Sequence, residues 1–220
     1  MDALARYYAQ RAPEYESIYQ KPERQADLRE LREFVAQTFA GRRVLEIACG
    51  TGWWTEVLSK TARSVVATDI NDEVLAIARR KQFGDASVSF QRTDAFQLEQ
   101  VAGEFDAALA VFWWSHLTPR DLDKFLEGLH RRLEPGSLVV FIDNNFAPGS
   151  STPISRRDQD GNTYQQRRLA DGSMTEVLKN FPTDEAITRA LQGRANGLTL
   201  RRSTYFWAGR HRTRPFAPNG

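Results

Sequence analysis

The sequence has little sulfur and almost no net charge. Its 220 residues contain a single cysteine, Cys49, so the chain can form no internal disulfide and no metal site built from several thiolates. Lys and Arg outnumber Asp and Glu by only two charges, too small an excess to require a nucleic-acid partner. No apolar run approaches the roughly 20 residues of a membrane span, and the polar N-terminus lacks the apolar core of a signal peptide. We therefore expect a cytoplasmic protein with no membrane segment and no metal.

The overall composition is that of an ordinary globular domain. Hydrophobic residues make up 41% of the chain and charged residues 26%, and the length suits one domain with a single core. Cys49 fits either a small buried residue or a reactive thiol. Strand and helix patterns alternate up to residue 142 without an internal repeat, and more β structure follows. This order predicts a doubly wound α/β fold.

The expected elements follow from apolar periodicity and from turn and capping residues. The strands are expected at 43–48, 65–69, 88–92, 105–112, 137–142, 197–203 and 204–210. The helices are expected at 3–19 with a break at Pro13, 23–40, 54–61, 72–81, 118–133 and 184–192. A polar loop over 147–162, expected to be mobile, leads into a β-hairpin of 163–169 and 174–180, and the tail from Thr213 to Gly220 is expected to be frayed.

The most informative stretch runs from Val44 to Gly52. It reads as a buried strand that enters a glycine-bearing turn and then a helix. Such a turn lets a ligand approach the backbone, and the first helical N–H groups point at the ligand. A second apolar run ends in Asp69, close to the roughly 20 residues after Gly50 at which an acid grips ribose hydroxyls.

These residues resemble the first motif of class I S-adenosylmethionine-dependent methyltransferases, which reads apolar-Leu-acid-apolar-Gly-Cys-Gly-Thr-Gly. Ala48 stands where the first glycine of that motif usually lies, and we expect it to keep a negative φ. A dinucleotide-dependent dehydrogenase would more often have a third glycine, where Thr55 stands here, and would lack the acid Glu46. The resemblance covers about residues 43–145. It implies a Rossmann-like, mostly parallel sheet of seven strands whose last strand is antiparallel.

The resemblance also implies a set of cofactor residues. Asp94 follows the third strand, where the family has an acid that accepts from the adenine amino group, although an isolated Asp there is also a common turn residue. One of Trp53 and Trp54 would pack in the core and the other would border the methionine part of the cofactor. The full set for S-adenosyl-L-methionine, with S-adenosyl-L-homocysteine as product, is Glu46, Ala48, Gly50, Gly52, Trp54, Asp69, Ile70, Asp94, Ala95, Phe96 and Phe112.

Acceptor residues are expected at strand ends and in the N-terminal segment. The carboxyl ends of parallel strands face the ligand crevice, which places 113–116 and 143–145 there. The N-terminal tyrosines either pack their helix on the body or close over the ligands as a lid. The predicted acceptor residues are Tyr7, Tyr8, Tyr15, Trp113, Trp114, Asp143 and Asn144, with at most one of the two tryptophans against the ligand.

Histidine supplies the one candidate base. His116 follows the fourth strand, and its imidazole either takes a proton from the acceptor or bonds a loop carbonyl. His130 is expected to pack on a helix, and His211, within a basic run, is expected to be solvated.

These observations favour a methyltransferase acting on O, N or S of a small molecule, with specialised metabolism as its candidate setting and a monomer or homodimer as its form. One domain over 1–220 would comprise a helical lid (1–40), a cofactor core (41–145), a loop and hairpin over the substrate side (146–182), and the last helix and strands (183–212). Arg201, Arg202, Arg210, Arg212 and Arg214 support an RNA or protein methyltransferase instead. A cofactor-binding protein without transfer and a nicotinamide-dependent dehydrogenase are the other classes. The sequence does not name the acceptor.

Overall fold

A single sheet of seven strands forms the centre of the molecule in the computed structural model, which describes residues 3–214. The strand order is β3-β2-β1-β4-β5-β10-β9. The strands are β1 (Arg43–Ile47), β2 (Ser64–Asp69), β3 (Ser87–Arg92), β4 (Ala107–Val111), β5 (Leu138–Asn144), β9 (Ala195–Arg202) and β10 (Phe206–Thr213). The first five run parallel, and β10 pairs antiparallel with both β5 and β9. The predicted fold class is confirmed.

The central strands are buried because both faces of the sheet are covered. Val44 of β1 belongs to one hydrophobic cluster and its neighbour Leu45 to the other, since successive side chains point to opposite faces. All five residues of β4 are buried, as expected of a parallel strand in the middle of a doubly wound sheet.

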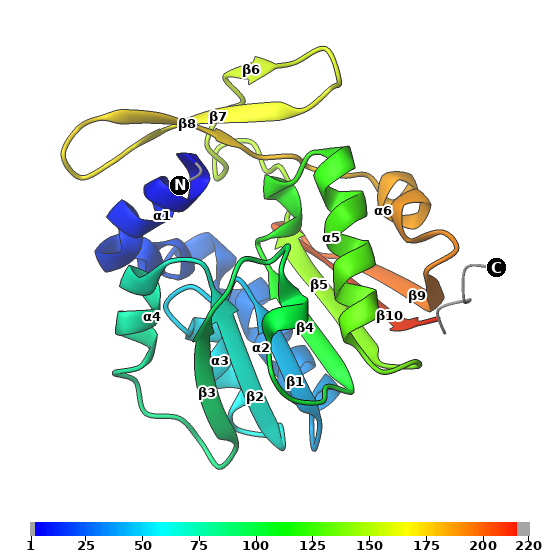
Figure 1. The fold of residues 1–220 in the computed structure, drawn as a ribbon. Coiled ribbons are helices and arrows are strands. Elements are labelled where there is room, and N and C mark those ends of the chain that lie inside the picture. Colours follow the sequence, from blue (N-terminus) through cyan, green and yellow to red (C-terminus); the bar gives the residue numbers. More distant parts are fainter. Residues whose placement is uncertain (1–2, 215–220) are drawn as a thin grey trace.

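Helices pack on each face of this sheet (Figure 1). α2 (Gln25–Thr38), α3 (Trp53–Leu58) and α4 (Asp72–Ala78) contribute to the cluster that contains Val44, whereas α5 (Pro119–Arg132) and α6 (Asp184–Leu191) contribute to the cluster that contains Leu45. Single 3₁₀ turns lie at η2 (Pro22–Arg24), η3 (Leu98–Gln100) and η4 (Trp114–His116). Within 3–214, every helix is too short or too polar to cross a membrane.

Two additions lie over the carboxyl end of the parallel strands. The chain begins with α1 (Ala3–Arg11) and the 3₁₀ segment η1 (Ala12–Tyr19), which together we call the N-terminal segment. A separate antiparallel sheet contains β6 (Arg156–Arg157), β7 (Thr163–Arg168) and β8 (Met174–Leu178). Figure 1 shows this small sheet beside α1, and Tyr7 packs there with Leu169 and Val177.

The structure corrects several expected boundaries. The predicted helix 3–19 changes to 3₁₀ geometry at Ala12, because Pro13 has no N–H to continue the helical ladder. The loop over 147–162, expected to be mobile, contains β6 and is tied through Ser150 to Lys21 and Arg24. Thr213 belongs to β10 rather than to a frayed tail, and residues 215–220 of that tail lie outside the described residues.

His211 was expected to be solvated and is instead buried. Along β10, Arg210 and Arg212 are exposed while His211 between them faces the core, as the two-residue period of a strand requires. Its Nε2 lies 3.0 Å from Nε2 of His130, which is also buried.

Candidate functional site

Two neighbouring cavities open where the parallel strands end. One lies over the β1, β2 and β3 ends, and we call it the cofactor cavity. The other lies between the N-terminal segment, β7 and the end of β8, and we call it the basic cavity. Tyr8, Tyr15 and Phe112 line both cavities, so the two cavities meet at these three side chains, which we call the shared wall.

The turn after β1 forms one side of the cofactor cavity through Ala48 and Gly50. The expectation of a negative φ at Ala48 is wrong, since its φ is 53°. The turn needs the left-handed conformation that the usual glycine adopts freely, and alanine adopts it here against the contact between its Cβ and the backbone. Gly50 is also left-handed, with φ 56°. The unusual residue of the motif therefore keeps the backbone shape of the motif at a cost in strain.

Asp69 links this turn to the end of β2. Its carboxylate accepts the backbone N–H of Gly50 at 2.9 Å and that of Asn71 at 2.9 Å. Burial raises the pKa of the Asp69 carboxyl, while these backbone hydrogen bonds act in the opposite direction. Each carboxylate oxygen has a second lone pair, so the group can still accept ribose hydroxyls from the cavity that it lines.

The far end of the cofactor cavity suits a flat, partly apolar ring. Ile70 and Phe96 line it and are exposed by 37% and 41%, unusual for apolar side chains of this size. Asp94 lies between them in the cavity wall, and one of its oxygens accepts the N–H of Phe96 at 2.9 Å. An adenine ring would cover the two apolar side chains and donate its amino group to Asp94, so the residues present fit S-adenosylmethionine.

The predicted cofactor residues divide into two groups. Those that line the cofactor cavity are Ala48, Gly50, Asp69, Ile70, Asp94, Ala95, Phe96 and Phe112. Glu46, Gly52 and Trp54 do not line it.

Each of these three has a structural task instead. Glu46 is buried, accepts the Thr55 hydroxyl at 2.6 Å, and has its pKa raised by burial to about 8. At Gly52, a Cβ would come within 3.1 Å of Ala78 Cβ, so this glycine lets the turn pack on α4. Trp54 was predicted to contact the cofactor but is buried in the hydrophobic cluster that contains Val44, with its ring against those of Tyr19 and Trp53.

The N-terminal tyrosines lie over the turn after β1, as the side chains of a lid would. Tyr15 lies so close to the turn that its Cε1 is 3.3 Å from the position a Cβ at Gly50 would take. Glu16 next to it accepts the hydroxyl of Thr51 at 2.7 Å and pairs with Lys81 at 2.5 Å. These contacts attach the N-terminal segment directly to the glycine turn and to the residues after α4.

The basic cavity has a volume of about 290 Å³, and among residues 3–214 its lining contains no acidic residue. The cations that line it are Arg11, Lys21, Arg24, Arg167, Arg168 and Lys179. Of these six, only Lys179 has a carboxylate at ion-pair distance among residues 3–214. Arg167 has, in addition, a buried Nε without a hydrogen-bond partner in that part of the chain. Within the described residues the cavity therefore concentrates positive charge, which Glu23 and Asp27 offset only in part at Lys21 and Arg24.

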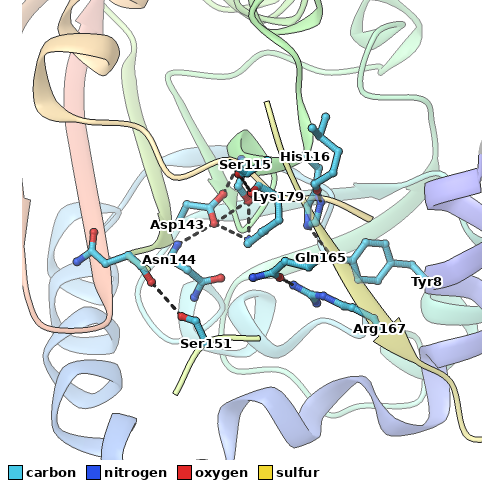
Figure 2. Close-up of polar contacts among 12 residues, drawn as sticks. Tyr8, Ser115, His116, Asp143, Asn144, Ser151, Gln165, Arg167 and Lys179 are labelled. Atoms are coloured by element: carbon cyan, nitrogen blue, oxygen red, sulfur yellow. Dashed lines mark hydrogen bonds and ion pairs between the residues drawn. The ribbon is translucent and has the colours of Figure 1, made fainter. Parts of the chain in front are cut away.

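Lys179 is held by a buried polar cluster at the end of β5 (Figure 2). Its Nζ lies 2.9 Å from Asp143 and donates to the Ser115 hydroxyl at 2.5 Å. The same Asp143 accepts the Ser115 N–H and hydroxyl, each at 2.9 Å. Asp143, predicted to bind the acceptor, lines neither cavity and instead holds Lys179, while its neighbour Asn144 lines the basic cavity directly.

His116 lines the cofactor cavity, but both of its ring nitrogens are occupied. Nδ1 lies 2.7 Å from the carbonyl oxygen of Leu178, which can only accept, so Nδ1 carries the proton. Nε2 is then an acceptor and takes the hydroxyl hydrogen of Tyr8 at 2.8 Å, a contact drawn in Figure 2. Burial, together with Lys179 and Arg167, lowers the pKa of His116 well below its usual value. His116 is a neutral ring that orients Tyr8.

The two adjacent tryptophans point different ways. Trp113 lines the cofactor cavity with its ring centroid 6.2 Å from that of Phe96, whereas Trp114 is buried against Phe141 and Trp207. Phe112 before them has φ 59°, which is rare for a bulky residue and holds its ring in the shared wall.

Comparison with known proteins identifies the domain. Residues 44–136 match the sequence profile of a methyltransferase domain. The chain is 26% identical to a solved structure described as a DhpI–SAH complex, with a TM-score of 0.77 and 97% of both chains covered. The chain has a class I S-adenosylmethionine-dependent methyltransferase domain. A second structure, described as a DhpI–SAM–HEP complex, is 27% identical with a TM-score of 0.77 and 96% of both chains covered.

Among curated proteins, a demethylmenaquinone methyltransferase of Clavibacter sepedonicus is 30% identical over 162 residues, which are 73% of this chain and 62% of that protein. The chain therefore spans less than two thirds of that relative's length. S-adenosylmethionine is the cofactor, and it fits the cavity whose wall contains Asp69, Asp94, Ile70 and Phe96.

Sequence reasoning missed most of the basic cavity. Its cations come from three separate places: the N-terminal segment and the turn after it, β7, and the end of β8. Four of the predicted acceptor residues, Tyr7, Tyr8, Tyr15 and Asn144, do line this cavity. The predicted hairpin contributes Gln165, Arg167 and Lys179 to it, although none of the cations was predicted to bind the acceptor.

Proposed function

We propose that the protein transfers the methyl group of S-adenosylmethionine to an oxygen, nitrogen or sulfur atom of a small molecule bound in the basic cavity. The observation that carries this proposal is the shared wall of Tyr8, Tyr15 and Phe112 between that cavity and the cofactor cavity. When bound, the cofactor supplies an activated methyl group. The protein then has to align the two reactants and exclude water.

The size of the basic cavity supports a small acceptor. About 290 Å³ lies at the lower end of the range for pockets that enclose small ligands. The relatives named for their substrates also act on small molecules, namely demethylmenaquinone and ubiquinone precursors and fatty acids. The DhpI–SAM–HEP complex supports room for a further component beside the cofactor in this fold.

Four of the five arginines that favoured RNA or protein as acceptor have partners for their side chains within the chain, and Arg210 is exposed. Arg201 stacks on Phe34 with its guanidinium carbon 3.7 Å from the ring centroid, and Arg202 pairs with Asp184 at 2.7 Å. Arg214 donates to the Asn196 side chain at 2.8 Å. These side chains support packing at the β9 edge of the sheet better than a free basic surface.

Formation of S-adenosylhomocysteine tests the proposal. The protein would be incubated with S-adenosylmethionine and either a metabolite extract filtered to small molecules or the retained macromolecules. We expect product with the filtered fraction. Product only with the macromolecules would contradict the small-molecule assignment, and binding of the cofactor without product in either fraction would indicate a binding protein.

A further inference from the structure

The chemical class of the acceptor can be inferred from the charges and the proton acceptors around the shared wall. This step rests on the proposed function. We propose that the methyl group is accepted by an anionic oxygen of a small organic acid, a carboxylate or a phosphorus oxyanion, so that the reaction needs no general base.

The charge of the basic cavity is unbalanced. Six cationic side chains line it, and Asp143 offsets only the charge of Lys179. Arg24 is buried, and its guanidinium donates to the hydroxyl and carbonyl of Ser150, while the carboxylates of Glu23 and Asp27 act on it from outside ion-pair distance. Arg24 and Lys179 are buried, and Arg11, Lys21 and Arg167 are half-buried, so the like charges of this cavity are only partly screened by water and repel one another unless an anion joins them. An acidic ligand would offset this cost, whereas a neutral alcohol or amine would not.

Arg167 has hydrogen-bonding capacity that the described residues do not use. Its Nη2 donates to Gln165 at 2.8 Å, but its Nε is buried without a partner among the described residues. The planar guanidinium matches an oxyanion with two parallel hydrogen bonds, which makes an acidic group a fitting partner for the unpaired N–H. Figure 2 shows Arg167 and Lys179 near the Tyr8–His116 contact, next to the shared wall.

Among the described residues, the side chains around the shared wall offer no free base. His116 donates from Nδ1 to Leu178, and its only lone pair already accepts from Tyr8. Burial raises the pKa of Tyr8 to about 12, so the phenol stays protonated, and it lowers the pKa of His116, so the imidazole is a weak final acceptor for a proton relayed through Tyr8. The carboxylate of Asp143 is engaged by Lys179 and Ser115 behind the wall. A neutral hydroxyl would have no group to receive its proton, while an oxyanion has no proton to lose.

The reaction then balances without a proton. A lone pair of the acceptor oxygen forms the new carbon–oxygen bond, and the carbon–sulfur bond breaks with its electron pair remaining on sulfur. One negative charge on the acceptor and the positive charge of the sulfonium disappear together. Cations that line the cavity hold the other oxygens of the acid, which leaves one oxygen free to meet the methyl carbon.

Binding is the first test, and it does not depend on turnover. Protein saturated with S-adenosylhomocysteine would be titrated calorimetrically with inorganic phosphate, benzoate and, as neutral probe, benzyl alcohol. We expect the two anions to bind and R167Q to weaken that binding by roughly tenfold or more, because a charge-assisted fork is lost. R167K keeps the charge but not the planar guanidinium with its two parallel N–H groups, so its anion affinity should lie between those of the wild type and R167Q. R29Q removes an exposed arginine of α2 outside the cavity and should change nothing.

The second test identifies the accepting atom. Carboxylic acids, phosphonic acids and their neutral alcohol and amine counterparts would be offered with S-adenosylmethionine, and the products identified by mass spectrometry and NMR. We expect methyl esters, with the two acid series showing which oxyanion is used, and no proton released per methyl transferred to a carboxylate. A methylated alcohol or amine with one proton released would overturn this inference but leave the proposed function intact. Anion binding equal in R167Q and R29Q would also overturn it.

Discussion

The buried pair of Lys179 and Asp143 allows a quantitative prediction. The two side chains are exposed by 4% and 0%, and the pair lies at 2.9 Å with further hydrogen bonds to Ser115. In Lys179→Met, the apolar replacement keeps most of the volume but leaves the Asp143 carboxylate buried without its cation. Such an uncompensated charge costs about 3–5 kcal/mol in free energy of unfolding. For a chain of this size, that corresponds to a fall in Tm of roughly 6–20 °C.

An exposed pair provides the control. Glu104, whose side chain is 78% exposed, pairs with Arg43 at 2.8 Å. Glu104→Gln should cost less than about 1 kcal/mol, because water already solvates both charges. Urea unfolding followed by circular dichroism measures both variants.

A double variant separates the cost of the unpaired charge from the cost of the lost contacts. Lys179→Met combined with Asp143→Asn removes both charges, and it should recover part of the stability lost in Lys179→Met alone. If Lys179→Met lost no more stability than Glu104→Gln, or if the double variant were the least stable, the description of this cluster as a buried ion pair would be refuted. Lys179→Met should also weaken anion binding in the basic cavity, since the pair fixes Nζ in its wall.

Three further predictions concern the turn, the ribose contact and acid stability. Ala48→Gly should raise the free energy of unfolding by about 0.5–1 kcal/mol, because it relieves a φ of 53°; destabilisation in urea would contradict this. Asp69→Asn should weaken S-adenosylhomocysteine binding by about 1–3 kcal/mol in calorimetry, and an unchanged Kd would argue against the ribose contact. Burial lowers the pKa of His130 to about 4 and that of His211 to about 3, aided by Arg194 and by His130 respectively. Below about pH 6.5 these histidines bind protons in the unfolded chain but not in the folded one, which lowers the unfolding free energy as the pH falls, whereas the raised pKa values of Glu46 and Asp69 act in the opposite direction. Between pH 6.5 and pH 5 the unfolding free energy should therefore fall less in His130→Gln than in the wild type, and identical slopes in the two proteins would exclude this linkage.

The cofactor half of the site was predictable because its residues follow one another along the chain. Gly50, Asp69 and Asp94 end three consecutive parallel strands, and parallel strands end at the same edge of a sheet. The motif did not reveal that Ala48 keeps the left-handed turn, since an alanine in that conformation is uncommon. Trp54 was misplaced for a related reason, as the motif gives the start of the helix but not the direction of each side chain.

The acceptor half was largely beyond the reach of the sequence. Arg11 and Arg167 are 156 positions apart and meet only because the N-terminal segment and β7 fold over the same end of the sheet. His116 was found at the expected strand end, but its role depends on Leu178, which no local pattern connects with it. The burial of His211 was readable in principle, since Arg210 and Arg212 alternate with it along β10.

The most direct test of the two-cavity account is a crystal structure of the protein with S-adenosylhomocysteine and a small organic acid. The account predicts adenosine against Asp69, Asp94 and Ile70, the thioether sulfur facing Tyr8 and Phe112, and the acid in the basic cavity against Arg167. Density for S-adenosylhomocysteine in the basic cavity, or for the acid outside it, would contradict the account.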